Sequence, residues 1–127
     1  MERWIWVAGG GALGALARYW LAGWVQQWTG PAFPWGTVAV NLFGSFLLGF
    51  VVQASLLGGW TGELRLLVAV GFLGAFTTFS TFAYEALELL RGGQGMEALM
   101  YVGLNLGLGL LLVMLGMATV LVMGGRG

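Results

Sequence analysis

The chain has 127 residues, of which 59% are hydrophobic and 8% are charged, and its formal net charge is zero. A soluble domain of this size carries roughly a quarter of its residues as charged side chains, so the composition predicts a protein solvated by lipid, and the zero net charge argues against a nucleic-acid partner. The sequence contains no Cys, His, Lys or Asp, which removes the usual metal sites and nucleophile–base arrangements, so an enzyme is not predicted.

Four stretches are long and apolar enough to be membrane spans, at about residues 4–26, 35–57, 64–90 and 97–123. A transmembrane helix needs about 20 mostly apolar residues to cross roughly 30 Å of hydrocarbon. Glycines, prolines and an arginine interrupt the apolar sequence between the stretches. We therefore expect an all-α integral membrane protein with four transmembrane helices, in which residues 1–127 form a single domain.

The seven tryptophans lie near the ends of these stretches. Tryptophan favours the membrane–water interface because its ring is apolar but carries a polar N–H. A soluble core would give no reason for such sorting, so the pattern supports four spans with an aromatic belt at each interface. Trp4, Trp6 and Trp60 belong to one belt, and Trp20, Trp24, Trp28 and Trp35 to the other.

The arginines give only a small difference in charge between the two sides of the membrane. Arg3, Arg65 and Arg126 fall on the side of the termini, against Arg91 and Arg18 on the other. Positive charge in short loops normally sets the orientation of a membrane protein. So small a bias permits insertion in both orientations, which would allow an antiparallel homodimer in the cell (inner) membrane.

Small residues recur four positions apart, a spacing that lets helix backbones approach each other closely in lipid. Four helices also leave little wall around a pore, so we expect an oligomer. The pairs are Gly10 and Gly14, Gly11 and Ala15, Ser45 and Gly49, and Gly103 and Gly107.

Polar side chains form a stripe on the second span and another on the fourth. Thr37, Asn41 and Ser45 are one helical turn apart, as are Tyr101 and Asn105. Polar groups at bilayer depth are costly and often mark a functional site. Each stripe could instead be hydrogen bonding that holds helices together, but two stripes on separate helices favour a shared polar track.

Residues 74–82, GAFTTFSTF, place hydroxyls and aromatic rings in the middle of the third span. Hydroxyls can bond back to the carbonyl one turn earlier, and glycine weakens a helix, so we expect the helix to break here. The freed carbonyls would suit an alkali cation, whereas the positive edges of the rings would suit an anion. The residues alone do not identify the ion.

Three motifs resemble the CrcB family, the Fluc fluoride channels, over nearly the whole chain. GGALGALARY at 10–19 resembles GGxxGAxxRY, GTVAVNLFGSFLLG at 36–49 resembles GTLxVNxxGSFxxG, and GFLGAFTTFSTF at 71–82 resembles GxxGxxTTFSTF. The resemblance implies an antiparallel, dual-topology homodimer with two pores. Fluoride that entered as the neutral acid and ionised in the cytoplasm would leave passively through these pores.

The resemblance also implies roles for individual residues. It makes Phe79 and Phe82 ring contacts for fluoride, Asn41 a donor in the pore and Tyr101 part of the polar track. Gly74 and Thr77 would offer backbone carbonyls to a structural sodium ion shared between the subunits.

Two charged residues also match family positions. Arg18 would lie near the pore vestibule, although its stem could instead carry the charge to the membrane interface, and Glu85 is a possible acid at the end of the pore. Asn105 and Gly109 stand where family members often carry serines.

Two other functions fit part of this pattern. A small dual-topology, proton-coupled exporter would need a carboxylate in its substrate pocket, and only Glu85 lies near the interior of a span. A non-conducting membrane assembly subunit would use the polar residues only to hold helices together. Fluoride and chloride efflux from liposomes that contain the pure protein would separate these alternatives.

Overall fold

The computed structural model describes residues 3–124, and every regular element in that range is helical. The first two helices are α1 (Arg3–Thr29) and α2 (Trp35–Leu57). The third consists of α3 (Gly62–Arg65), the π-helical η1 (Leu66–Leu73), the short α4 (Gly74–Phe76) and, after a break, α5 (Phe79–Arg91). The fourth consists of α6 (Gly95–Val102), the π-helical η2 (Gly103–Leu108) and α7 (Gly109–Gly124).

Three helices in the described range are long and apolar enough to cross a membrane, at Trp35–Leu57, Gly62–Arg91 and Gly95–Gly124. The first predicted span, α1, is not among them. Its 27 residues reach about 40 Å at 1.5 Å per residue, so its length suffices. It is less apolar because Arg18, Gln26 and Gln27 interrupt its hydrophobic sequence, together with the tryptophans.

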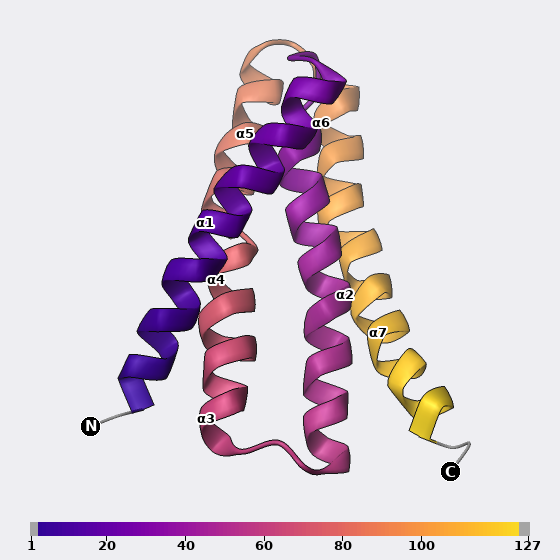
Figure 1. The fold of residues 1–127 in the computed structure, drawn as a ribbon. Helices are drawn as coiled ribbons and strands as arrows, with labels where there is room; N and C mark the ends of the chain where they lie inside the picture. The colour runs from indigo at the N-terminus through magenta and orange to yellow at the C-terminus, as the bar shows by residue number, and fades with distance from the viewer. Residues whose placement is uncertain (1–2, 125–127) are drawn as a thin grey trace.

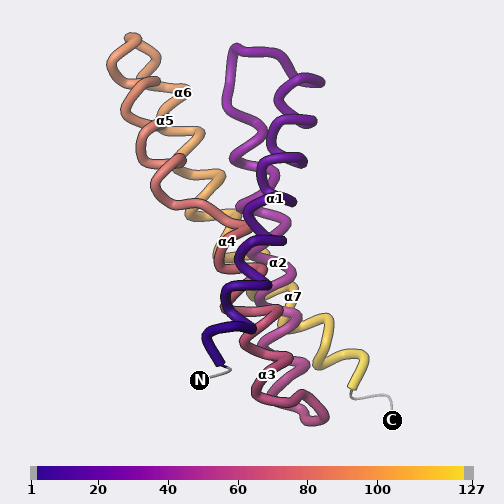
Figure 2. The backbone as a smooth tube through the Cα atoms, turned by 60° about the vertical axis from the view of Figure 1, so that its left-hand side comes forward, coloured from indigo at the N-terminus to yellow at the C-terminus, as the bar shows by residue number. Residues whose placement is uncertain are grey.

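The helices run up and down, so that the start of α1 and the end of α7 lie at one end of the molecule (Figure 1). At that end α1 lies beside the lower part of the third helix, and α2 packs along α7. Arg3 and Arg65 lie at this end, Arg91 lies at the other, and Arg126 lies outside the described residues. At the opposite end the α1–α2 tip and the α5–α6 tip separate (Figure 2).

Close contact between helix backbones confirms part of the small-residue prediction. A Cβ atom on Gly14 would lie 2.1 Å from the Phe72 carbonyl oxygen, and one on Gly49 would lie 2.1 Å from the Val113 carbonyl oxygen. Only glycine fits at such contacts. The Gly103–Gly107 pair differs, because a Cβ on either residue would meet nothing within 4 Å in the described chain.

The upper half of the molecule is held together by an apolar core between α2, α5 and α6. Its most deeply buried member is Tyr101, which is 0% exposed. This core matters for function because it contains one of the two predicted pore phenylalanines and the predicted pore tyrosine. Its buried residues are Val38, Phe82, Ala86, Leu89, Ala98 and Tyr101.

Candidate functional site

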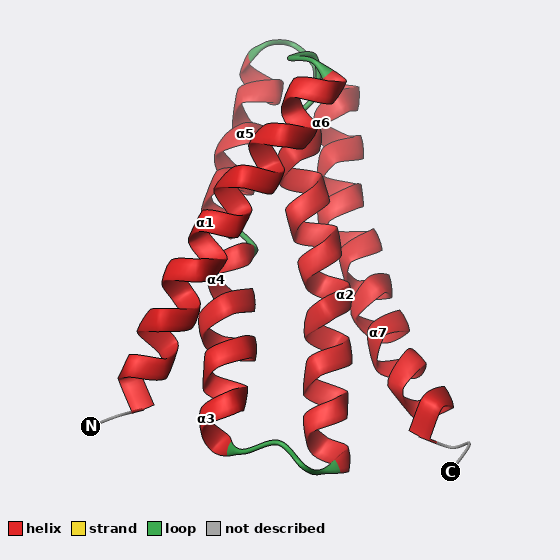
Figure 3. Cartoon of the chain, in the orientation of Figure 1, coloured by secondary structure: helices red, strands yellow, loops and turns green. Residues whose placement is uncertain are grey.

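The third helix breaks at Thr77 and Thr78, as predicted. Both residues are extended, with φ −85° and ψ 157° at Thr77 and φ −143° and ψ 118° at Thr78. Figure 3 draws this segment as a loop between α4 and α5. The Thr77 hydroxyl donates to the Leu73 carbonyl, one turn earlier, at 3.2 Å, which is the local competition that disfavours continuation of the helix.

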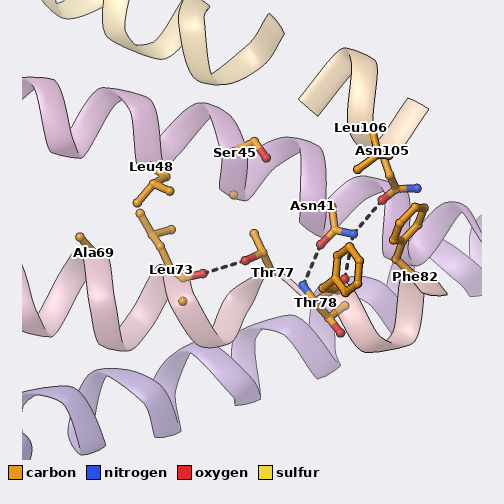
Figure 4. Close-up of a pocket in the computed structure, with 13 residues that line it drawn as sticks. Asn41, Ser45, Leu48, Ala69, Leu73, Thr77, Thr78, Phe82, Asn105 and Leu106 are labelled. Atoms are coloured by element: carbon orange, nitrogen blue, oxygen red, sulfur yellow. Dashed lines mark hydrogen bonds between the residues drawn. The ribbon is translucent and has the colours of Figure 1, made fainter. Parts of the chain in front are cut away.

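Asn41, on α2, supplies hydrogen bonds that the broken helix lacks. Its Oδ1 accepts from the Thr78 N–H at 2.8 Å, and its Nδ2 donates to the Thr78 carbonyl at 3.1 Å (Figure 4). An unpaired buried backbone group would cost about 1–3 kcal/mol. The side chain of Asn41 therefore holds the break open in one conformation.

A second asparagine meets Asn41 from η2. Asn41 Nδ2 donates to Asn105 Oδ1 at 2.7 Å, and Asn105 Nδ2 donates to the Tyr101 carbonyl at 2.9 Å. Asn105 is buried. The structure thus joins the predicted polar stripes of the second and fourth spans into one hydrogen-bonded group at the break.

The helix after the break begins with its own cap. The Thr78 Oγ1 accepts from the Thr81 N–H at 3.3 Å, a typical N-cap contact. In an unbroken helix the Thr81 N–H would bond the Thr77 carbonyl, and the Thr78 N–H would bond the Gly74 carbonyl. Both carbonyls lose those donors at the break.

Arg18 lies beside this break. Its Nε donates to the Ala75 carbonyl at 2.9 Å, although the two residues are 57 positions apart in sequence. The bond places a half-buried guanidinium at the C-terminal end of α4, where the helix dipole favours positive charge. Sequence reasoning assigned Arg18 to a vestibule or to the interface and did not foresee this bond.

The two predicted ring residues follow the break as neighbours. The centroids of Phe79 and Phe82 are 5.6 Å apart with an interplanar angle of 64°, so one ring presents its edge to the other. Phe82 is 7% exposed and packs on Tyr101, with centroids 5.4 Å apart. Phe79 is 73% exposed, so this single chain leaves one of the two rings without a wall around it.

A cavity of about 260 Å³ lies at the break, between α2, the third helix and η2 (Figure 4). Its lining contains amide, hydroxyl and backbone polar groups beside aromatic and aliphatic side chains. The residues around it, all within the described range, include no charged side chain. The lining includes seven of the predicted site residues: Asn41, Ser45, Gly74, Thr77, Phe79, Phe82 and Asn105.

Three further predicted residues meet one turn away from the cavity. Glu85 Oε1 accepts hydrogen bonds from the Thr37 hydroxyl and, at 3.0 Å, from the Tyr101 hydroxyl. Thr37 precedes Asn41 by one helical turn, and Tyr101 precedes Asn105 by one turn. The polar groups therefore continue from the cavity to a single carboxylate.

Glu85 also borders a second, larger cleft, of about 470 Å³, at the end where the two helix tips separate. Glu88 lines the same cleft and forms a 3.7 Å ion pair with Arg91. The cleft and the cavity lie on either side of the Thr37–Tyr101–Glu85 cluster. Because the cleft lies at the tip of the molecule, it is a candidate opening of the polar track.

Gln26 is a residue at this end that sequence reasoning missed. Its Nε2 donates to the carbonyls of Gly30 at 2.6 Å and Phe33 at 2.9 Å, and its Oε1 accepts from the Gly36 N–H at 3.0 Å. It thereby fixes the α1–α2 connection, which places the Phe33 ring edge-on to Tyr101, with centroids 5.5 Å apart. No sequence motif marks Gln26.

Within residues 3–124 no group of three or more acidic, His or Cys side chains could hold a metal ion. The neutral oxygens near the break are candidate ligands for an alkali cation. The Gly74 and Thr77 carbonyls are two of them, because each has lost its helical N–H donor at the break.

Comparison with known proteins gives a consistent result. Residues 5–117 match the family described as CrcB-like protein, Camphor Resistance (CrcB). A fluoride-specific ion channel FluC of Thermus thermophilus is 54% identical over 116 residues, covering 91% of each chain. Proteins of the same description from Hahella chejuensis and Rhizobium meliloti are 51% and 45% identical, covering 90% and 88% of this chain and 91% and 90% of theirs.

Proposed function

This chain belongs to the CrcB-like family, and we propose that it lets cytoplasmic fluoride leave the cell passively, which lowers its concentration and toxicity. The chain is a multi-pass membrane channel specific for fluoride and not an enzyme. The observation that carries the mechanism is the cavity at the break, which is lined by the Asn41 amide and by the Phe79 and Phe82 rings and by no charged side chain of the described residues.

Selectivity follows from what such a cavity offers to an anion. Fluoride is small and strongly hydrated, so it enters only where hydrogen-bond donors replace its water, and a dehydrated charge without partners is very costly in a low-dielectric site. Amide N–H groups and positive ring edges supply favourable contacts. Chloride is larger and a weaker acceptor, so the same donors compensate less of its dehydration.

Because no side chain that lines the cavity in the described part of the chain carries a full positive charge, a bound anion can be released quickly enough for conduction. Conduction requires binding that is favourable enough for entry but weak enough for release. Neutral amides, hydroxyls and ring edges meet both conditions, whereas an arginine in direct contact would hold the anion. The path continues from Asn41, Phe79 and Ser45 through Asn105 to Tyr101, Thr37 and Glu85.

Passive conduction is favoured over proton-coupled export by the position of the acidic group. A coupled exporter requires a carboxylate in its substrate pocket. In the described chain the cavity lining contains no carboxylate, and Glu85 is one turn away with two hydroxyls bound to it. The site therefore lacks a proton carrier beside the ion.

Purified protein in liposomes should release fluoride down its gradient once a potassium ionophore balances the charge, and chloride release should be slower by at least about 100-fold, the discrimination that roughly 2.7 kcal/mol provides. Ion-selective electrodes measure both ions on the same preparation. Fluoride release that requires a proton gradient, or chloride release at a similar rate, contradicts the proposal. A preparation that releases neither ion supports the assembly-subunit alternative.

We also propose that two copies of the chain, each a single domain of residues 1–127, pair antiparallel in the membrane. The exposed Phe79 ring supports this, because a second copy would supply the missing wall of the path. The small difference in arginine number between the two ends supports insertion in both orientations. With two copies, each chain would contribute to two pores.

Gly95→Cys tests this arrangement. Gly95 is exposed at the start of α6, a Cβ there meets nothing within 4 Å, and the sequence has no other cysteine. A membrane-impermeant thiol reagent applied to one side of sealed vesicles should label about half of the chains, and lysis should expose the rest. Labelling of all or none of the chains from one side would reject dual topology.

The freed carbonyls of Gly74 and Thr77 would hold a structural sodium ion between the two copies. Oxygen ligands of this neutral, hard type suit an alkali cation, and the bound ion would link the subunits and add positive potential near both paths. The neighbouring Ala75 carbonyl already accepts a hydrogen bond from Arg18. The carbonyls left for a cation are therefore those of Gly74 and Thr77 in each chain.

Exhaustive replacement of sodium by N-methylglucamine should lower the thermal stability of the detergent-solubilised dimer and reduce fluoride flux. Calorimetry and the liposome assay measure the two effects separately. If both the melting temperature and the flux are unchanged after prolonged exchange, no sodium site is present.

A further inference from the structure

The side-chain amide of Asn41 has no N–H left for an ion in this conformation. An asparagine carries two amide hydrogens. One bonds the Thr78 carbonyl at 3.1 Å, and the other bonds Asn105 Oδ1 at 2.7 Å. An anion that uses Asn41 as a donor must therefore displace one of these two acceptors.

The two acceptors are not equally movable. The Thr78 carbonyl belongs to a backbone segment that Asn41 binds at both ends, through the N–H and the carbonyl of the same residue. Asn105 contributes only a side-chain oxygen, which can move by rotation of its own side chain. The Asn105 oxygen is therefore the acceptor that can yield to an ion.

Three hydroxyl donors along the track are also occupied. The Tyr101 and Thr37 hydroxyls both donate to Glu85, and the Thr77 hydroxyl donates to the Leu73 carbonyl. A buried polar group without a partner is costly, and each of these three hydroxyls has an internal acceptor when no ion is present. At Asn41 that internal acceptor lies in the cavity beside the ring pair.

We propose that the Asn105 side-chain oxygen is a built-in competitor for fluoride at Asn41, and that its displacement determines which anions are accepted. This inference rests on the proposed function. A hydrogen bond to an anion is about twice as strong as one between neutral groups, so fluoride displaces the amide oxygen. Chloride, a weaker acceptor, gains too little at the same N–H to do so.

Asn105 is held in this role by its other end. Its Nδ2 donates to the Tyr101 carbonyl, one turn earlier on the fourth helix, and this bond fixes which end of the amide faces Asn41. When fluoride arrives, the oxygen can swing aside while the Nδ2 bond restricts how far it moves. The competitor therefore returns when the ion leaves.

The sequence offers a direct measurement, because Asn41 and Asn105 are its only asparagines. Selective labelling with ¹⁵N at the asparagine side chain gives two amide signals in the detergent-solubilised full-length protein, and Asn105→Ser assigns them by removing one. Sodium fluoride should shift the Asn41 amide protons of the natural protein strongly, whereas sodium chloride at the same concentration should not.

Flux measurements on the Asn105→Ser variant test the same inference functionally. Serine can still bond back to the Tyr101 carbonyl, but it is too short to reach Asn41. Fluoride flux per active channel should rise about tenfold, which corresponds to roughly 1.4 kcal/mol of lost competition, and chloride flux should rise by a larger factor. Thr119→Ala is the matched control: Thr119 also bonds the carbonyl one turn earlier on α7, away from the cavity, and its removal should leave both fluxes unchanged.

Flux per active channel is measured at low protein density, where the plateau of release gives the fraction of active vesicles and the initial rate gives the rate per channel. If neither asparagine amide shifts in fluoride, the inference is overturned even if Asn105→Ser does not fold, since that measurement uses the natural protein and needs no assignment. A folded Asn105→Ser with unchanged or lower flux, or with unchanged selectivity, also overturns it. A natural protein that conducts no fluoride overturns the proposed function itself.

Discussion

Asn41→Leu is expected to reduce fluoride flux by about 100-fold or more, the scale seen when one hydrogen-bond donor to a developing anion is removed from a water-poor site. Leucine has a similar volume but supplies no N–H to replace the water of fluoride. Asn41 also binds Thr78 through two hydrogen bonds. We therefore expect a second effect, a loss of stability of about 1–3 kcal/mol for each backbone group left unpaired.

Asn41→Asp tests the donor in a second way. A carboxylate keeps an acceptor for the Thr78 N–H but removes both N–H donors and places a negative charge where the anion must pass, so it should block flux at least as fully as leucine. Flux per active channel, the plateau of release and the unfolding temperature are measured on both variants. An Asn41→Leu protein that folds and conducts as the natural protein does would mean that Asn41 only connects helices.

Phe79→Ile is expected to lower fluoride flux about tenfold, because an edge contact with an aromatic ring contributes roughly 0.5–1.5 kcal/mol that an aliphatic side chain does not supply. Phe79 is 73% exposed in the single chain, so the substitution leaves no hole in the core of the chain. Folding of the chain should be unaffected, and the change in flux should report the chemistry of the ring.

Phe82→Ile should lower flux as well, but it should also destabilise the fold, since Phe82 is 7% exposed and packs on Tyr101. A change of shape in a packed core typically costs about 1–3 kcal/mol. Phe43→Ile is the control: Phe43 is an exposed ring on α2 that contacts Phe76 edge-on and does not line the cavity. If the Phe79→Ile protein conducts fluoride as fast as the Phe43→Ile control, the edge of the Phe79 ring has no role in conduction.

The two phenylalanines therefore have different roles in the site. Phe82 belongs to the same apolar core as Tyr101, so its position is set by packing within one chain. Phe79 turns outward from that core, and its surroundings depend on what lies beside the chain in the membrane. The test of the dimer by Gly95→Cys labelling and the Phe79→Ile test are therefore linked. Loss of the second copy should remove the contribution of Phe79 to fluoride flux, whereas Phe82 should stay buried within its own chain.

The sequence by itself determined the features that depend on neighbouring residues. The apolar stretches predicted four long helices, because the membrane requires about 20 such residues per span. The hydroxyls of GAFTTFSTF predicted the break, because Thr77 competes for the Leu73 carbonyl within one turn. The family motifs, which are also local, led to the fluoride channel.

Only the tertiary structure decided which polar groups are partners. Asn41 and Thr78 are 37 positions apart, and Arg18 and Ala75 are 57 positions apart. Periodicity places a side chain on a helix face but does not determine which helix that face meets, or at what height, because that depends on glycine contacts such as those of Gly14 and Gly49. In a lipid-exposed bundle every buried donor still needs an acceptor, and the packing of the helices alone determined that the acceptors for Asn41 are Thr78 and Asn105.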